Sequence, residues 1–249
     1  MPAQHQAARW PRPVTLAMAV LPGLGPADNM APVLSIDLQK PFHTTVDWRV
    51  TAYQAAGDEG RFGDLAARIC FRRGAAGTEE ACTPLMRAAI NDSDRLVYQT
   101  VTGLSVVHLT RSNPPVLGVL AEAQMNYGGS GTATQYAVWA YHRGADRFQP
   151  LATFQIAQQG EFEIIDTGPL AGSVVTAEYV LGDGETHFGR HHFAIAVHLL
   201  DPVTLLYTDV LHYVTRLKYP SLDEGGVDVI RPEMPATLRI LKYLYPTNF

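Results

Sequence analysis

The stretch QYAVWAYHRGADRFQPLATFQIAQQGEFEII, residues 135–165, contains the clearest indication of the fold. Its side chains alternate with a period of two or form short apolar runs, as is typical of β-strands. Turn-forming residues interrupt the pattern at 144–146 and at 158–160. The stretch therefore predicts consecutive strands joined by tight turns, over 135–142, 149–156 and 161–166.

The same pattern extends over most of the chain. Short alternating or apolar segments are separated by Gly, Pro, Asn and Asp, which allow positive φ or remove a ladder donor. The further strands expected are 33–38, 45–52, 67–72, 96–100, 105–110, 116–124, 174–181, 191–199 and 205–216. Many short strands predict an all-β fold with antiparallel sheets in a sandwich or a partly open, barrel-like arrangement.

Two segments have helical features. Residues 79–89 have acceptable helix propensity, but Pro84 limits them to a short helix or turn. Near the C-terminus, Leu238, Leu241 and Tyr245 recur at helical spacing. This spacing predicts a C-terminal α-helix that starts near Pro235 and packs on a sheet.

Composition indicates a globular protein with a substantial core. Hydrophobic residues make up 47% of the 249 residues and charged residues 17%, which argues against intrinsic disorder. The net charge is −5 without a basic cluster, so nucleic acid is not an expected partner. No apolar run reaches the roughly 18 residues that span a bilayer, so no transmembrane segment is expected. We expect a single β-rich domain over 28–249, with two apposed β subdomains dividing near 126–132 as the alternative.

Residues 1–27 have the layout of a secretory signal peptide. Arg9 and Arg12 carry its only formal charges, and an apolar run over 14–21 follows them. Small residues at positions 25 and 27 suit the peptidase, so we expect cleavage after Ala27. An unprocessed, slightly apolar tail is the alternative. The predicted localisation is periplasmic or secreted.

The two cysteines, Cys70 and Cys82, lie on either side of a Gly-containing segment that suits a hairpin turn. In an exported protein, this spacing predicts one disulfide between facing strands. Closing such a loop stabilises the fold by about 3 kcal/mol in the chain-entropy model. Two buried free thiols are the alternative.

A histidine cluster is the candidate metal site. His187, His191 and His192 follow Glu185, and imidazole and carboxylate ligands suit zinc. In an extended strand, however, His191 and His192 point to opposite faces. The chain also lacks His-Glu-x-x-His and other common catalytic templates. We therefore expect no cofactor and keep zinc as the alternative.

Aromatic and basic side chains gather in the second half of the chain. Where they occupy outward-facing sheet positions they form a candidate ligand-binding surface, since Tyr, Trp and Arg contribute strongly to interfaces. The candidate residues are Trp139, Tyr141, His142, Arg143 and His198. Ordinary packing within a sheet is the competing explanation.

These patterns favour an exported, non-catalytic binding module that recognises a protein, a peptide or a glycan through this surface. Two alternatives stay open. The first is a secreted metal-dependent hydrolase that uses the loop from Asp183 to His192. The second is a structural or assembly component of the cell envelope. An enzyme is the less favoured class, because no catalytic residue can be assigned from the sequence.

Overall fold

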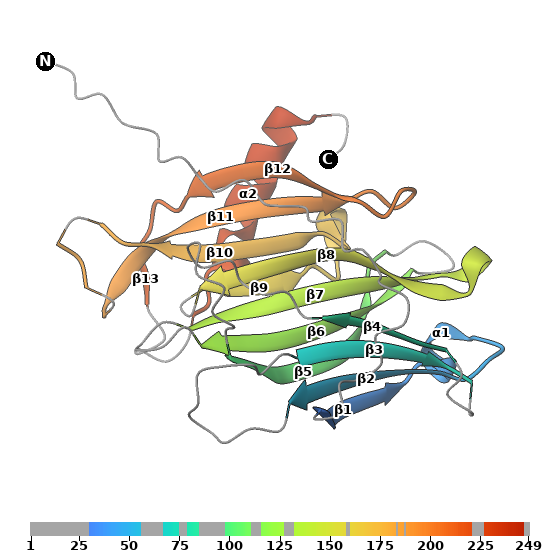
Figure 1. Cartoon of the computed structure of the whole chain (residues 1–249). Helices are drawn as coiled ribbons and strands as arrows, with labels where there is room; N and C mark the ends of the chain where they lie inside the picture. Colours follow the sequence, from blue (N-terminus) through green and yellow to red (C-terminus); the bar gives the residue numbers. More distant parts are fainter. Residues whose placement is uncertain are drawn as a thin grey trace, which may run out of the picture.

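The computed structural model of the chain describes residues 30–55, 67–74, 79–84, 98–110, 116–126, 132–157, 160–182, 184–186, 188–220 and 227–246. Among these residues, antiparallel strands form three sheets, which confirms the predicted β-dominated fold with a C-terminal helix (Figure 1). The predicted signal peptide lies outside the described residues, as does most of the predicted boundary near 126–132.

In each sheet, strands that follow one another in the sequence pair in space. The first sheet contains β1 (Met30–Asp37), β2 (Trp48–Ala55), β3 (Ala67–Arg73) and β4 (Glu79–Pro84). The second contains β5 (Tyr98–His108), β6 (Leu117–Asn126), β7 (Thr132–His142) and β8 (Arg147–Ala157). The third contains β9 (Glu161–Ile164), β10 (Val174–Val180), β11 (Arg190–Leu200) and β12 (Tyr207–Val214), and β13 (Tyr219–Pro220) pairs with β11. Between strands lie α1 (Gln39–Phe42), η1 (Arg143–Ala145) and η2 (Gly168–Leu170), and α2 (Ile230–Leu244) follows the third sheet.

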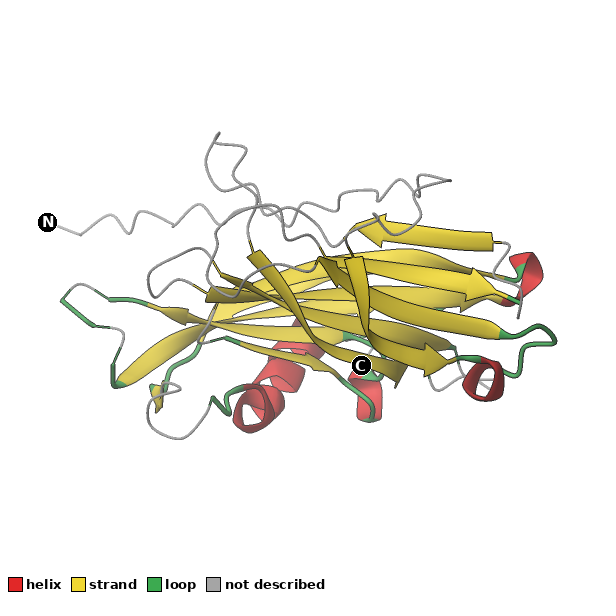
Figure 2. Cartoon of the chain, turned by 60° about the horizontal axis from the view of Figure 1, so that its bottom comes forward, coloured by secondary structure: helices red, strands yellow, loops and turns green. Residues whose placement is uncertain are grey.

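The second sheet lies between the other two and is buried on both faces. On β7, Ala137 and Trp139 belong to a core shared with the first sheet, whereas Val138 and Ala140 belong to a core shared with the third. In Figure 1 the three sheets succeed one another from the bottom of the view to the top. Figure 2 shows the helices at the periphery of the stacked strands. Burial on both faces explains why β7 is apolar at successive positions.

Helix α2 packs on the outer face of the third sheet and starts earlier than predicted. Ile230 and Leu241 of α2 are buried in one core with Phe193 of β11. The carboxylate of Glu161 accepts hydrogen bonds from the backbone N–H groups of Val229 (2.7 Å) and Ile230 (2.9 Å). Because this distant carboxylate satisfies donors at the helix start, α2 begins at Ile230 and the predicted start near Pro235 is wrong. No helix among the described residues combines the length and apolar composition needed to cross a bilayer.

Two further predictions need correction. Residues 79–84 form strand β4, so the helix expected over 79–89 is wrong in this part. Pairing with β3 overrides the local helix propensity. The two strands expected over 96–100 and 105–110 are one strand, β5, whose register shifts between Val101 and Gly103.

The predicted disulfide is confirmed. Cys70 on β3 and Cys82 on β4 are direct cross-strand partners, and a disulfide joins them. Among the described residues no free cysteine remains. The bond therefore fixes the register of the β3–β4 pair at the edge of the first sheet.

The turn after η2 brings the third sheet close to the end of β5. Gly172 has φ +86, and a Cβ built on it would lie 1.6 Å from the carbonyl oxygen of Leu109. Its own N–H donates to the carbonyl oxygen of Ile165 (2.7 Å). Both the backbone conformation and the close approach therefore require glycine here.

Candidate functional site

A pocket of about 240 Å³ lies where loops of the three sheets meet. Its lining residues come from α1, the start of β6, the end of β7 with η1, and the loop between β11 and β12. These elements lie on the right-hand side of the molecule in Figure 1. The lining residues are Phe42, Val116, Leu117, Tyr141, His142, Arg143, Pro202, Val203 and Leu205. The walls are thus mainly apolar, and the polar lining groups are basic or phenolic.

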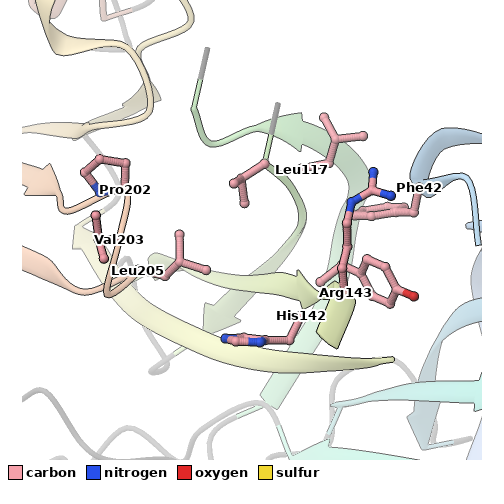
Figure 3. A pocket seen from close by; sticks show the side chains of 9 residues that line it. Phe42, Leu117, His142, Arg143, Pro202, Val203 and Leu205 are labelled. Atoms are coloured by element: carbon pink, nitrogen blue, oxygen red, sulfur yellow. The ribbon is translucent and has the colours of Figure 1, made fainter. Parts of the chain in front are cut away.

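Two opposed walls define the opening (Figure 3). Pro202, Val203 and Leu205 lie on one side, and Phe42 and Arg143 lie on the other. His142 and Leu117 lie between these walls. Because the walls belong to different sheets, the pocket depends on how the sheets pack together.

The Phe42 wall is rigid because its ring is packed among other aromatic rings. Phe42 is 2% exposed and makes edge contacts with Tyr141 (centroids 5.7 Å apart) and Phe148 (5.0 Å). Asp37 holds the start of α1 by accepting the backbone N–H of Gln39 at 2.9 Å. A side chain held this way needs little ordering when a ligand binds.

Asp146 anchors the other part of this wall. It ends η1 with φ 44, a left-handed conformation that Asp tolerates. Its carboxylate accepts hydrogen bonds from Trp48 Nε1 (2.9 Å) and the Tyr141 hydroxyl (2.6 Å), and it pairs with Arg73. The Tyr141, Trp48 and Arg73 donors hold the pKa of Asp146 below its usual value. Burial and the bond to Asp146 raise the pKa of Tyr141 to about 12, so the phenol stays protonated.

The opposite wall is a short loop held by its own backbone. The Asp201 carboxylate accepts the N–H groups of Val203 (2.7 Å) and Thr204 (3.1 Å), which lowers its pKa. The N–H of Leu205 donates to the carbonyl of Asp201 at 2.8 Å. This turn presents apolar side chains to solvent, since Val203 is 88% exposed and Leu206 60%. Exposed aliphatic groups at a fixed turn are available for contact with a partner.

Three of the five predicted ligand-binding residues line this pocket, namely Tyr141, His142 and Arg143. Trp139 does not, because it is 1% exposed and packs against Phe71 in the core. His198 is 8% exposed and contacts the ring of Phe154, with centroids 5.1 Å apart. Burial lowers the pKa of His198 and so favours its neutral form. Trp139 and His198 are therefore packing residues, and a binding role for the other three stays a prediction.

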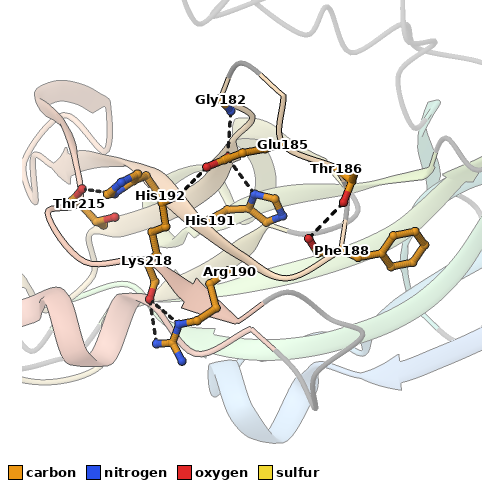
Figure 4. A network of polar contacts seen from close by, with 9 residues as sticks. All are labelled: Gly182, Glu185, Thr186, Phe188, Arg190, His191, His192, Thr215 and Lys218. Carbon is orange, nitrogen blue, oxygen red and sulfur yellow. Dashed lines mark hydrogen bonds and ion pairs between the residues drawn. The ribbon is translucent and has the colours of Figure 1, made fainter.

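Three of the candidate metal ligands, Glu185, His191 and His192, make the polar contacts drawn in Figure 4. His191 Nδ1 lies 3.3 Å from Glu185 Oε2, and Lys218 donates to the other oxygen of Glu185. His192 Nδ1 lies 2.9 Å from the carbonyl oxygen of Thr215. The neighbouring histidines thus have separate partners, in agreement with their predicted opposite orientation. His187 lies outside the described residues, and among those described no three candidate ligands converge on one point.

The network holds the β10–β11 loop in place. Lys218, the N–H of Gly182 and His191 together lower the pKa of Glu185 to about 2, so the carboxylate is ionised. The His191 side chain is 1% exposed, and its Nε2 is buried with no hydrogen-bond partner among the described residues. A substrate in solvent does not reach this ring, so the contacts favour a structural role.

Sequence reasoning missed the apolar half of the pocket. Phe42, Leu117 and Leu205 lie far apart in the chain, and nothing in their local pattern shows that they meet. The one available indication was the turn that begins at Asp201, where the loop Asp-Pro-Val-Thr-Leu-Leu between two strands is unusually rich in apolar side chains.

In comparisons with known proteins, no family model, no curated protein and no solved structure matches the chain. The functional assignment therefore depends on the geometry of the site.

Proposed function

We propose that the chain is an exported, non-catalytic binding module that takes an apolar group of a protein, peptide or glycan partner into this pocket. The observation that carries the proposal is the convergence of rigid apolar walls from three sheets on one opening that also contains Arg143 and His142. A preformed, mainly apolar pocket with a few polar groups is the usual form of a binding site.

The contacts around the histidine cluster support a binding role over hydrolysis. His191, the histidine with a carboxylate partner, is buried, and its neighbour His192 is engaged by a backbone carbonyl. A general base has to lie within hydrogen-bond reach of its substrate. Among the described residues that line the pocket there is no Asp or Glu.

Export is part of the proposal, and the disulfide supports it. Disulfides persist in oxidising compartments and are rare in the cytosol of mesophiles. The test is to express the full chain in a bacterium, fractionate the cells and sequence the N-terminus of the product. The proposal expects a periplasmic or secreted product that starts at Asp28. An unprocessed cytoplasmic product would contradict it.

The binding proposal is tested by NMR titration of the oxidised protein. The probes are N-acetyl-phenylalaninamide, N-acetyl-leucinamide and the disaccharide chitobiose. At least one probe is expected to shift the amide resonances of Tyr141, His142 and Leu205. Val203→Asp should weaken this response, whereas the matched control Leu217→Asp, at a 66% exposed position outside the pocket lining, should not. Equal responses in both variants would contradict the assignment.

The edge of the third sheet supports a second candidate, a structural or assembly component. Among the described residues β12 pairs only with β11, and its Val214 is 45% exposed. An unpaired edge can add a strand from another chain. Sedimentation equilibrium tests this candidate: concentration-dependent association that is lost in Val214→Lys would favour it over the binding module.

A further inference from the structure

The charged groups around the pocket favour an anionic ligand, an inference that rests on the proposed binding function. The Arg143 side chain is exposed, and its guanidinium makes no hydrogen bond or ion pair with another described residue. In Figure 3 it lies beside Phe42 on one wall of the opening. A guanidinium placed next to apolar walls suits a carboxylate that is joined to an apolar group.

Two carboxylates adjacent in sequence to lining residues, Asp146 and Asp201, already accept hydrogen bonds within the protein. Asp146 accepts hydrogen bonds from Trp48, Tyr141 and Arg73. Asp201 accepts hydrogen bonds from backbone groups of its own loop. No Asp or Glu is among the described residues that line the pocket, so Arg143 is the fully charged side chain in this part of the lining. Charge complementarity therefore assigns an acidic group to the partner.

The size of the pocket limits what enters it. Its volume of about 240 Å³ is below the roughly 300–1,000 Å³ of sites for drug-sized ligands. A cavity of about 150 Å³ accommodates a benzene ring. The pocket thus holds one large side chain rather than a whole cofactor. The exposed aliphatic side chains of Val203 and Leu206 extend the apolar surface beyond the opening, which suits a polypeptide partner.

We propose that the pocket binds a peptide segment in which a large apolar side chain is adjacent to an acidic one. The apolar side chain enters between Phe42 and Leu205, and the neighbouring carboxylate pairs with the guanidinium of Arg143. Arg143 is the residue that selects an acidic neighbour, and the apolar walls select the side chain that is inserted.

The experiment is an NMR titration with capped hexapeptides in a Gly/Ser background. The three peptides have Phe-Asp, Phe-Asn or Gly-Asp at the centre, and 3-phenylpropionate is the small-molecule probe. The Phe-Asp peptide is expected to bind about five-fold tighter than the Phe-Asn peptide. This ratio corresponds to about 1 kcal/mol, the free energy of a favourable exposed ion pair. The Gly-Asp peptide should bind more weakly than both.

Variants at Arg143 test the assigned contact. Arg143→Gln should remove the preference for Phe-Asp and leave Phe-Asn binding unchanged. Arg143→Lys should retain a smaller preference because the charge remains. The matched control Arg216→Gln, at another exposed arginine outside the pocket lining, should retain the full preference. Amide spectra that match the wild type establish that each variant is folded.

The outcomes separate this inference from the proposed function. Equal affinity for the Phe-Asp and Phe-Asn peptides, with shifts at the pocket, overturns the inference and leaves the binding module standing. A tighter complex with 3-phenylpropionate than with the Phe-Asp peptide overturns the peptide assignment in favour of a small carboxylate. The absence of shifts at the pocket with every probe overturns both.

Discussion

Asp146→Asn tests how the first sheet fixes the wall of the pocket. The Asp146 carboxylate joins Trp48 and Arg73 of the first sheet to Tyr141, which lines the pocket. Asparagine tolerates the left-handed conformation at φ 44 and keeps nearly the same shape. The substitution therefore removes the charge and leaves the backbone unstrained.

The expected loss of stability follows from the three contacts. A hydrogen bond to a charged group contributes about 1.5–3 kcal/mol and a neutral one about 1 kcal/mol, so each of the bonds from Trp48 and Tyr141 loses about 0.5–2 kcal/mol. Because the Asp146 side chain is 28% exposed, the lower part of this range applies, and the two bonds together cost about 1–2 kcal/mol. The pair with Arg73, whose side chain is 38% exposed, adds at most about 1 kcal/mol. We therefore expect Asp146→Asn to lower the free energy of unfolding by about 2 kcal/mol at neutral pH.

Urea unfolding of the oxidised protein, followed by circular dichroism, measures this loss. Asp209→Asn is the matched control, because Asp209 has the same 28% side-chain exposure and pairs at the surface with His212 alone among the described residues. We expect the control to change stability by less than about 0.5 kcal/mol. A loss of the same size in both variants would refute the reasoning.

The pH dependence gives a second check on Asp146. Its pKa in the folded protein lies below the ordinary 3.8, so its charge stabilises the fold above pH 3.8. This contribution is lost as the pH falls through the lowered pKa. The difference in stability between wild type and Asp146→Asn should therefore shrink below pH 3.8. A difference that stays constant between pH 7 and pH 3 would show that the charge is not its source.

Three further predictions concern the fold. Replacing both Cys70 and Cys82 by Ser should lower the free energy of unfolding by about 3 kcal/mol. Reducing the wild-type disulfide with dithiothreitol should lower it by a similar amount. Unchanged urea midpoints would contradict this prediction. Gly172→Ala should lower the free energy of unfolding by about 3 kcal/mol or more, because strain at positive φ adds to the clash with Leu109. The control Gly144→Ala, where the new Cβ has open space around it, should change stability little. Equal urea midpoints for the two variants would refute the close approach between Gly172 and Leu109. Glu161→Gln should lower the free energy of unfolding by about 1 kcal/mol and speed amide hydrogen exchange in the first turn of α2, because the charged cap is lost. Unchanged exchange rates would argue against capping by this carboxylate.

Local pattern was sufficient to predict most strands and the disulfide. Alternation and turn residues place most strands without knowledge of the sheets, and the Gly-containing segment between Cys70 and Cys82 predicts their facing positions. Strand β4 was mistaken for helix because Glu and Ala are good helix formers, and only pairing with β3 decides otherwise. The start of α2 was missed because its cap, Glu161, is distant in the sequence.

The candidate site was only partly predictable. Tyr141, His142 and Arg143 are predicted from the sequence as aromatic and basic side chains on an outward-facing part of a sheet. The structure places them at the end of β7 and in the turn that follows. Trp139 was grouped with them, but whether a strand is covered on one face or both depends on the order of the sheets. The apolar wall opposite Phe42 comes from a loop about 160 residues further along the chain, and no local pattern reports that contact.

The central claim is that the pocket between the three sheets binds a group of a partner. Intermolecular nuclear Overhauser effects between the protein and a bound peptide test this claim most directly. The sample is the oxidised full chain, labelled at its methyl groups and saturated with the Phe-Asp peptide. We predict contacts from the peptide ring to the methyl groups of Leu117, Val203 and Leu205, which lie around the opening. Contacts to methyl groups elsewhere, such as Val214 or Leu217, without contacts to these three would contradict it.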